Sequence, residues 1–121
     1  MTGVTALGGV FIRATDPEAL AAWYQETLGL TFEGASEKSA VLPDTGSAYA
    51  VVALFPRDSS YLGDPNRQQA MINLRVDDLA AVYARLDTLG VAHDAIEDSE
   101  YGRFGWITDL EENRVELWQP A

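Results

Sequence analysis

Hydrophobic residues in the first part of the chain follow the periodicity of a strand and then that of a helix. Val10–Ile12 is a short apolar run typical of a β-strand. Apolar residues then recur at spacings of three and four, which predicts an amphipathic helix over about 16–28. Asp16 can cap this helix, Pro17 suits its first turn, and Gly29 can end it in the left-handed conformation.

Strand-like runs follow this helix, and a polar segment then interrupts them. The predicted strands are Leu30–Phe32, Ala40–Leu42 and Tyr49–Phe55, with a turn at Pro43–Ser47. The polar segment, about residues 57–69, has the composition of a connector because it contains Gly63 and Pro65 and lacks an apolar period.

The same order of elements returns after the connector. Met71–Val76 is a predicted strand, Asp77 and Asp78 offer a helix cap, and an apolar stripe runs to Leu89 before Gly90. Three further strands are predicted at Val91–Ile96, Phe104–Ile107 and Arg114–Trp118.

The chain therefore reads as two βαβββ modules, one at about 5–56 and the other at about 70–120, within a single domain over 1–121. This is an α+β arrangement. One helix per module covers only one face of its sheet, so we expect two curved mixed sheets around a cleft, with the helices outside.

Composition narrows the possible functions. A chain of 121 residues with 47% hydrophobic residues suits one folded domain, and no apolar run is long enough for a membrane span or a signal peptide, so we expect a cytoplasmic protein. Nineteen acidic against eight basic residues give a formal charge of -11, which disfavours nucleic acid and membrane surfaces as partners. The absence of cysteine excludes disulfides and thiolate chemistry, and His93 is the one histidine.

Several short motifs resemble those of the vicinal oxygen chelate superfamily, the group of glyoxalases, bleomycin-resistance proteins and extradiol dioxygenases. They occur in the family's order over about 7–120: Thr15-Asp16-Pro17, Trp23-Tyr24, Leu28-Gly29-Leu30, Val76-Asp77-Asp78-Leu79, Leu89-Gly90-Val91 and Asn113-Arg114-Val115-Glu116-Leu117. The resemblance implies the paired-module fold, a small-molecule ligand and a homodimer.

The family's metal-ligand positions are largely empty of donors here. By resemblance they correspond to Gly9, Ala53, Met71 and Glu116, of which only Glu116 carries a metal-binding side chain. One carboxylate cannot hold a divalent ion against water, so we expect no metal and no other cofactor. His93 lies away from these positions and is expected to be a surface histidine.

Residues two apart on a strand share a face, so the matched positions predict which side chains line the cleft. Ile72 and Leu74 should then face the helix. The ligand-binding residues expected from this alternation are Phe11, Arg13, Val51, Phe55, Asn73, Arg75 and Trp118, with Arg114 also on the inward face. The resemblance to the family's seventh strand implies that Phe104 and Trp106 are ligand-binding residues too and that Thr108 faces inward.

Two charged groups have alternative interpretations. Arg13 and Arg75 occupy equivalent places in the two modules, where they could bind an anion, reach solvent, or pair with acidic side chains. Glu116 could act as a catalytic acid or base without a metal, or could form an ion pair with Arg13, Arg75 or Arg114.

The turn before the last strand departs from the family pattern Asp-Pro-x-Gly-Asn. Here it is Asp109-Leu110-Glu111-Glu112-Asn113, so Glu112 stands where glycine would readily take a positive φ. We expect a local rearrangement, or Asn113 in that conformation, with the strand retained.

Three functions fit these observations. The first is a glyoxalase- or bleomycin-resistance-like module that binds a small, partly aromatic or apolar molecule in a metal-free cleft. The second is a lyase, isomerase or dioxygenase-type enzyme that uses Glu116 or a non-standard metal site. The third is a structural or regulatory dimer whose cleft is filled by side chains.

Overall fold

The computed structural model describes residues 3–42 and 49–121, and these residues form two helices and seven strands. Contacts divide them into two units. The N-terminal unit is residues 9–71, and the C-terminal unit combines residues 3–8 with 72–121. The predicted turn at Pro43–Ser47 lies outside the described residues.

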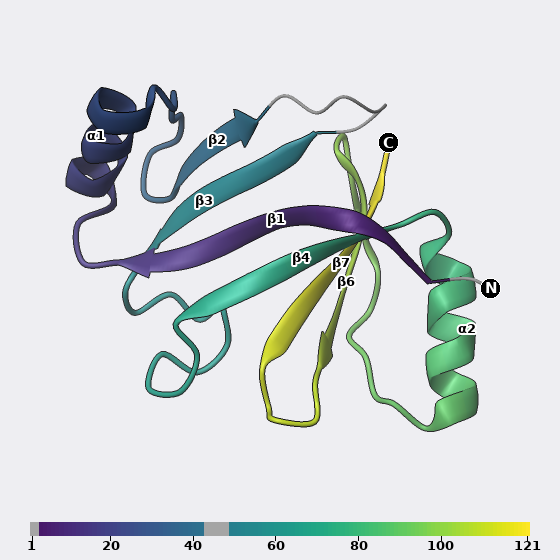
Figure 1. Cartoon of the computed structure of the whole chain (residues 1–121). Coiled ribbons are helices and arrows are strands. Elements are labelled where there is room, and N and C mark those ends of the chain that lie inside the picture. The colour runs from purple at the N-terminus through teal and green to yellow at the C-terminus, as the bar shows by residue number, and fades with distance from the viewer. Residues whose placement is uncertain (1–2, 43–48) are drawn as a thin grey trace. The chain divides into compact units, whose positions relative to one another are not determined.

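The N-terminal unit contains most of β1 (Val4–Ala14), followed by α1 (Pro17–Leu28), β2 (Lys38–Leu42) and β3 (Ala50–Pro56). β3 lies between the other two strands, parallel to β1 and antiparallel to β2. α1 packs against β3 through a core that includes Ala21 and Leu54 (Figure 1).

The C-terminal unit repeats this plan with one more strand. It contains most of β4 (Ala70–Val76), then α2 (Leu79–Leu89), β5 (Glu97–Ser99), β6 (Gly102–Thr108) and β7 (Arg114–Pro120). The strand order is β4-β7-β6-β5, with β4 parallel to β7 and the other neighbours antiparallel. A strand, its crossover helix and a parallel last strand thus occur in both units, which confirms the predicted α+β fold with repeated modules.

Both helices begin and end at the predicted signals. Asp16 and Asp78 each accept a hydrogen bond from the backbone N–H three residues on, at 3.0 Å. Gly29 and Gly90 end the helices with φ of 75° and 73°. A side chain at either glycine would be strained at that φ, which is why glycine suits these ends.

Two of the predicted strands do not form. Leu30–Phe32 forms no strand, and only Glu33 makes an isolated bridge, to Ser39. Val91–Ile96 is likewise irregular apart from a bridge between His93 and Ile107, and β5 begins at Glu97 instead. Short apolar runs of this kind pack beside the helices, where Phe32 and Ile96 fill core positions without joining a ladder.

The turn before β7 shows how Glu112 is accommodated at the position where the family pattern has glycine. Glu112 itself takes a positive φ of 68°, so the expectation that Asn113 would adopt this conformation is wrong, and β7 is retained. Oδ1 of Asp109 accepts hydrogen bonds from the N–H groups of Glu111 and Asn113, at 2.9 and 2.8 Å. These bonds hold the tight turn and lower the pKa of Asp109, mainly through the contacts with Asn113.

Neither helix among the described residues has both the length and the apolar character needed to cross a bilayer.

Candidate functional site

The strands of the C-terminal unit separate their side chains between two faces. Leu74, Ile107, Val115 and Leu117 pack into the core beneath α2. The alternate positions therefore lie on the opposite face, where Asn73, Trp106 and Glu116 contact one another. Leu74 lies against the helix as expected, whereas Ile72 is 43% exposed.

Glu116 is a buried carboxylate held by two neutral donors. Only 1% of the residue is exposed. Asn73 donates from Nδ2 to Oε1 at 2.7 Å, and Trp106 donates from Nε1 to Oε2 at 3.0 Å. We call these three residues the Glu116 network. Burying a carboxylate is costly unless its oxygens receive hydrogen bonds, and these two bonds offset part of that cost.

Asn73 is oriented by this carboxylate. The residue is 2% exposed, and its position on β4 is in register with Glu116 on the parallel strand β7. Because a carboxylate only accepts, the amide must present Nδ2 to it, which directs Oδ1 elsewhere. Within residues 3–42 and 49–121, no donor reaches this Oδ1.

Gly8 leaves the space that Asn73 occupies. A Cβ added at Gly8 would overlap Oδ1 of Asn73 and come within 3.0 Å of the Trp118 ring. Gly8 was not among the residues expected at the site, because the face of a glycine cannot be read from a pattern of side chains. Its only sequence signal is the Gly8-Gly9 pair inside an otherwise apolar strand.

Aromatic side chains extend this face beyond the Glu116 network. Phe104 and Trp118 stack with their centroids 6.0 Å apart and their planes 4° from parallel. The Trp118 indole donates to the carbonyl of Tyr101 at 2.9 Å, which fixes the ring. Trp118 is buried, whereas Phe104 is half-buried and presents part of its surface.

The charged residues expected on this face have different surroundings. Arg114 pairs with Asp94 at 3.0 Å, and its guanidinium carbon lies 5.3 Å from the centroid of the Trp106 ring. Arg75 is half-buried, and Thr108 is exposed at the end of β6. Arg114 therefore contributes both an ion pair and a cation–π contact beside the network.

A second aromatic group belongs to the N-terminal unit. Phe11, Phe55 and Tyr61 contact one another, with Phe55 and Tyr61 stacked at 5.4 Å and Phe11 5.5 Å from Phe55. Val51 lies half-buried on the same strand as Phe55, in register with Gly9. Tyr61 was missed because it lies in the connector, where no periodicity assigns a face.

Arg13 is buried and organises that connector. It is 2% exposed, and its guanidinium donates to four backbone carbonyl oxygens at 2.7–3.0 Å, those of Arg57, Ser59, Gly63 and Gln68. The sequence predicts an anion, solvent or an acidic side chain as the partner of Arg13, whereas in the structure its partners include these backbone carbonyls of the connector. Most donors of the guanidinium are thereby used within the protein.

The donor set at the family's metal positions does not fit a divalent ion. A Cβ at Gly9 would overlap the carbonyl oxygen of Val51, and Ala53 and Met71 are buried residues without a suitable donor. The oxygens of Glu116 already accept hydrogen bonds. Among the described residues, no three His, Cys, Asp or Glu side chains are grouped as metal ligands. We therefore derive no chemistry through a metal.

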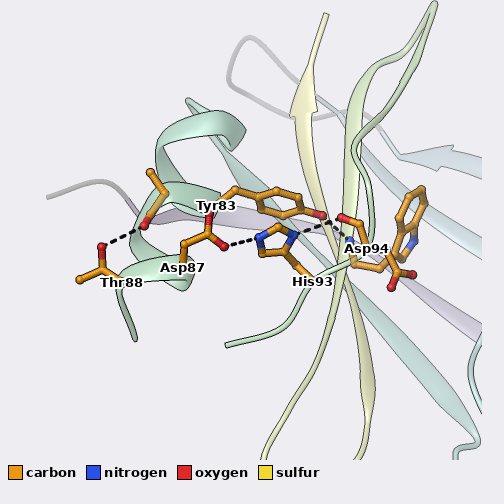
Figure 2. Close-up of polar contacts among 7 residues, drawn as sticks. Tyr83, Asp87, Thr88, His93 and Asp94 are labelled. Atoms are coloured by element: carbon orange, nitrogen blue, oxygen red, sulfur yellow. Dashed lines mark hydrogen bonds and ion pairs between the residues drawn. The ribbon is translucent and has the colours of Figure 1, made fainter. Parts of the chain in front are cut away.

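His93 lies beside α2, where its partners are an acid and an aromatic ring (Figure 2). Its Nε2 is 2.7 Å from Oδ1 of Asp87, and its ring stacks on Tyr83 with the centroids 3.9 Å apart. The hydrogen bond to Asp87 is the main cause that raises the pKa of His93. This histidine was expected at the surface, and its side chain is 22% exposed.

Comparison with known proteins places this geometry in context. Residues 9–118 match the family model of a glyoxalase-like domain. The comparison with curated proteins gives no significant match.

Solved structures share the fold at low identity. Methylmalonyl-CoA epimerase from Mycobacterium tuberculosis is 24% identical with a TM-score of 0.68, and the match covers 98% of this chain and 89% of the epimerase. A glutamine-to-alanine variant of the Streptomyces coelicolor epimerase, in complex with 2-nitronate-propionyl-CoA, is 21% identical with a TM-score of 0.72. That match covers 95% of this chain and 96% of the other. At such identities, the likeness establishes the fold alone.

Proposed function

Because this chain belongs to the glyoxalase-like domain family of the vicinal oxygen chelate superfamily, we propose that it binds a small, partly aromatic or apolar molecule without a metal ion. The ligand packs on the face of the C-terminal unit that carries the Glu116 network. We further propose that the protein acts in the cytoplasm and forms a homodimer. Light scattering coupled to size-exclusion chromatography would test the oligomeric state.

The observation that carries this proposal is the buried carboxylate of Glu116. Apolar residues of similar volume often stabilise a protein as well as a buried polar group or better, so such a group has a stability cost that function can justify. Here the carboxylate accepts from an amide and an indole, and the stacked rings of Phe104 and Trp118 lie on the same face, an arrangement typical of sites that combine apolar contact with a few oriented polar groups.

Phe104, Arg75 and Arg114 are half-buried on this face, so parts of their side chains are accessible to a ligand. A flat or apolar group would stack on Phe104, whose ring is supported from below by Trp118. The positive charge of Arg75 and Arg114 on this face would favour an anionic substituent on the ligand. An acyl thioester such as propionyl-CoA and an aromatic acid such as 1-naphthoate are suitable probes of these two features.

An enzyme that uses Glu116 as a general base is the second candidate. One observation favours it: the carboxylate is buried and accepts hydrogen bonds from an amide and an indole, and a carboxylate in such surroundings can serve as a proton acceptor. The described face supplies no identified nucleophile, so the reaction would be a proton transfer, as in an isomerisation.

Native mass spectrometry of the protein purified from cells, followed by titration with both probes, tests the proposal. Trp23 is 54% exposed on α1, so a Trp23→Phe background leaves Trp106 and Trp118 as fluorescence reporters. We expect quenching by at least one probe, and an affinity about tenfold weaker in Phe104→Ala. Leu110→Ala, at a residue 98% exposed, is the matched control and should bind normally.

The outcomes separate the candidates. A retained mass or quenching that Phe104→Ala weakens supports binding. Conversion of a probe that Glu116→Gln abolishes would replace the binding module by the enzyme. If no mass is retained and neither probe changes the fluorescence, the binding proposal fails and the structural interpretation takes its place.

A further inference from the structure

Trp106 is held through its backbone as well as through its indole. Its N–H donates to the hydroxyl of Tyr83 on α2 at 3.1 Å, and its carbonyl accepts from the N–H of Asp94 at 3.0 Å. The same residue donates from its indole to Glu116. Trp106 therefore links Tyr83 and Asp94, which contact its backbone, to Glu116, which accepts from its indole. A change at Tyr83 or Asp94 can move that indole through Trp106 alone.

The Tyr83 hydroxyl reaches β6 because Gly105 leaves room for it. A Cβ at Gly105 would overlap this hydroxyl and lie 2.7 Å from Cζ of Tyr83. Tyr83 is buried, and its hydroxyl accepts the backbone N–H of Trp106 in the middle of β6. The contact between α2 and β6 is therefore a directional hydrogen bond as well as a packing contact. Burial is also the main cause that raises the pKa of Tyr83, so the phenol stays protonated at neutral pH.

His93 fixes the other side of the Tyr83 ring. The His93 ring stacks on Tyr83 and is oriented by Asp87, which lies on α2 together with Tyr83, as Figure 2 shows. The charged groups around it are Asp87 on α2 and Asp94 beside it in the chain, whose carboxylate pairs with Arg114 of β7. From β6, the backbone of Ile107 bridges to His93. A change in the charge of His93 thus acts directly on the face of the Tyr83 ring.

We propose that Tyr83 is a positioning residue of the Glu116 network, and that the protonation of His93 reaches Trp106 through the Tyr83 ring. The inference rests on the proposed function for the importance of Glu116. Its test needs no ligand, so a failure of either one is recognised separately.

The test is NMR of the ¹⁵N-labelled full chain, which contains three tryptophans. In Tyr83→Phe, which removes only the hydroxyl, we expect the Trp106 indole resonance to shift and the exchange protection of the Trp106 amide to fall about tenfold more than that of other core amides. The indoles of Trp23 and Trp118 should stay in place. Tyr24→Phe makes the same chemical change on α1, where Tyr24 contacts Trp23, and should leave the Trp106 and Trp118 indoles unchanged.

An unshifted Trp106 indole in folded Tyr83→Phe, or an equal loss of protection over the whole core, would overturn the proposal. The wild-type chain provides a second measurement if that variant does not fold. Its Trp106 indole should titrate with the same midpoint as the His93 ring, and His93→Gln should abolish that titration. A Trp106 indole that stays fixed while His93 titrates would also refute the coupling.

Discussion

Asn73 and Glu116 are register partners on parallel strands, and their side chains form a 2.7 Å hydrogen bond on the face away from α2. The two residues are far apart in the sequence. The parallel crossover through α2 brings them together, and the carboxylate then determines which end of the amide faces it.

Replacement of Glu116 distinguishes hydrogen bonding from charge. In Glu116→Gln, Asn73 can turn its Oδ1 to the new amide while Trp106 still donates, so unfolding free energy should fall by less than about 1 kcal/mol. Glu116→Ala leaves both donors and a cavity, and should cost about 3–5 kcal/mol. Urea unfolding measures both variants. Equal losses would contradict the arrangement described for Asn73.

Gly8→Ala should displace the Asn73 side chain. The added methyl overlaps Oδ1 of Asn73, so we expect a loss of about 1–3 kcal/mol of unfolding free energy. The loss should shrink in an Asn73→Ala background, because the overlapping atoms are then absent. Gly3→Ala is the control, since a Cβ at Gly3 has nothing within 4 Å. Additive losses at residues 8 and 73 would show that the two do not meet.

Arg13→Lys should loosen the connector. A lysine ammonium cannot reach all four carbonyl oxygens that the guanidinium contacts, and buried carbonyls would lose their donors. We expect a cost of about 2–4 kcal/mol and faster proteolysis within residues 57–69. Arg85→Lys, on the exposed part of α2, is the matched control. Unchanged cleavage in Arg13→Lys would remove the structural role assigned here.

Glu112→Gly should stabilise the turn before β7. Glu112 has a φ of 68°, a conformation that costs a side-chain-bearing residue about 1–2 kcal/mol and glycine very little. The greater freedom of glycine in the unfolded chain offsets part of this, so the net gain should be about 0.5–1 kcal/mol. Thermal unfolding would measure it, and a lower Tm would argue against this backbone conformation.

His93 should make stability depend on pH in a defined direction. Its pKa is raised in the folded state, mainly by Asp87, so folding favours the protonated ring. That contribution is complete below the ordinary pKa of about 6.5 and is lost as the pH rises through the folded pKa. The Tm difference between the wild type and His93→Gln should therefore be larger at about pH 6 than at about pH 9. A difference that grows with pH would reverse the assignment.

Much of the fold follows from local signals. Asp16 and Asp78 cap the helices, Gly29 and Gly90 end them, and alternation assigns Leu74 and Glu116 to opposite faces. These features depend on a few neighbouring residues, so the sequence determined them by itself.

Only the tertiary structure decided the partners. Arg13 binds the carbonyls of a connector, His93 stacks on Tyr83, and Oδ1 of Asn73 fits against Gly8. Each contact joins segments whose separation in the chain sets no distance between them. A periodic pattern can assign a residue to a face, but which groups meet there depends on how strands and loops pack, because hydrogen bonds and ring contacts act over only a few ångströms.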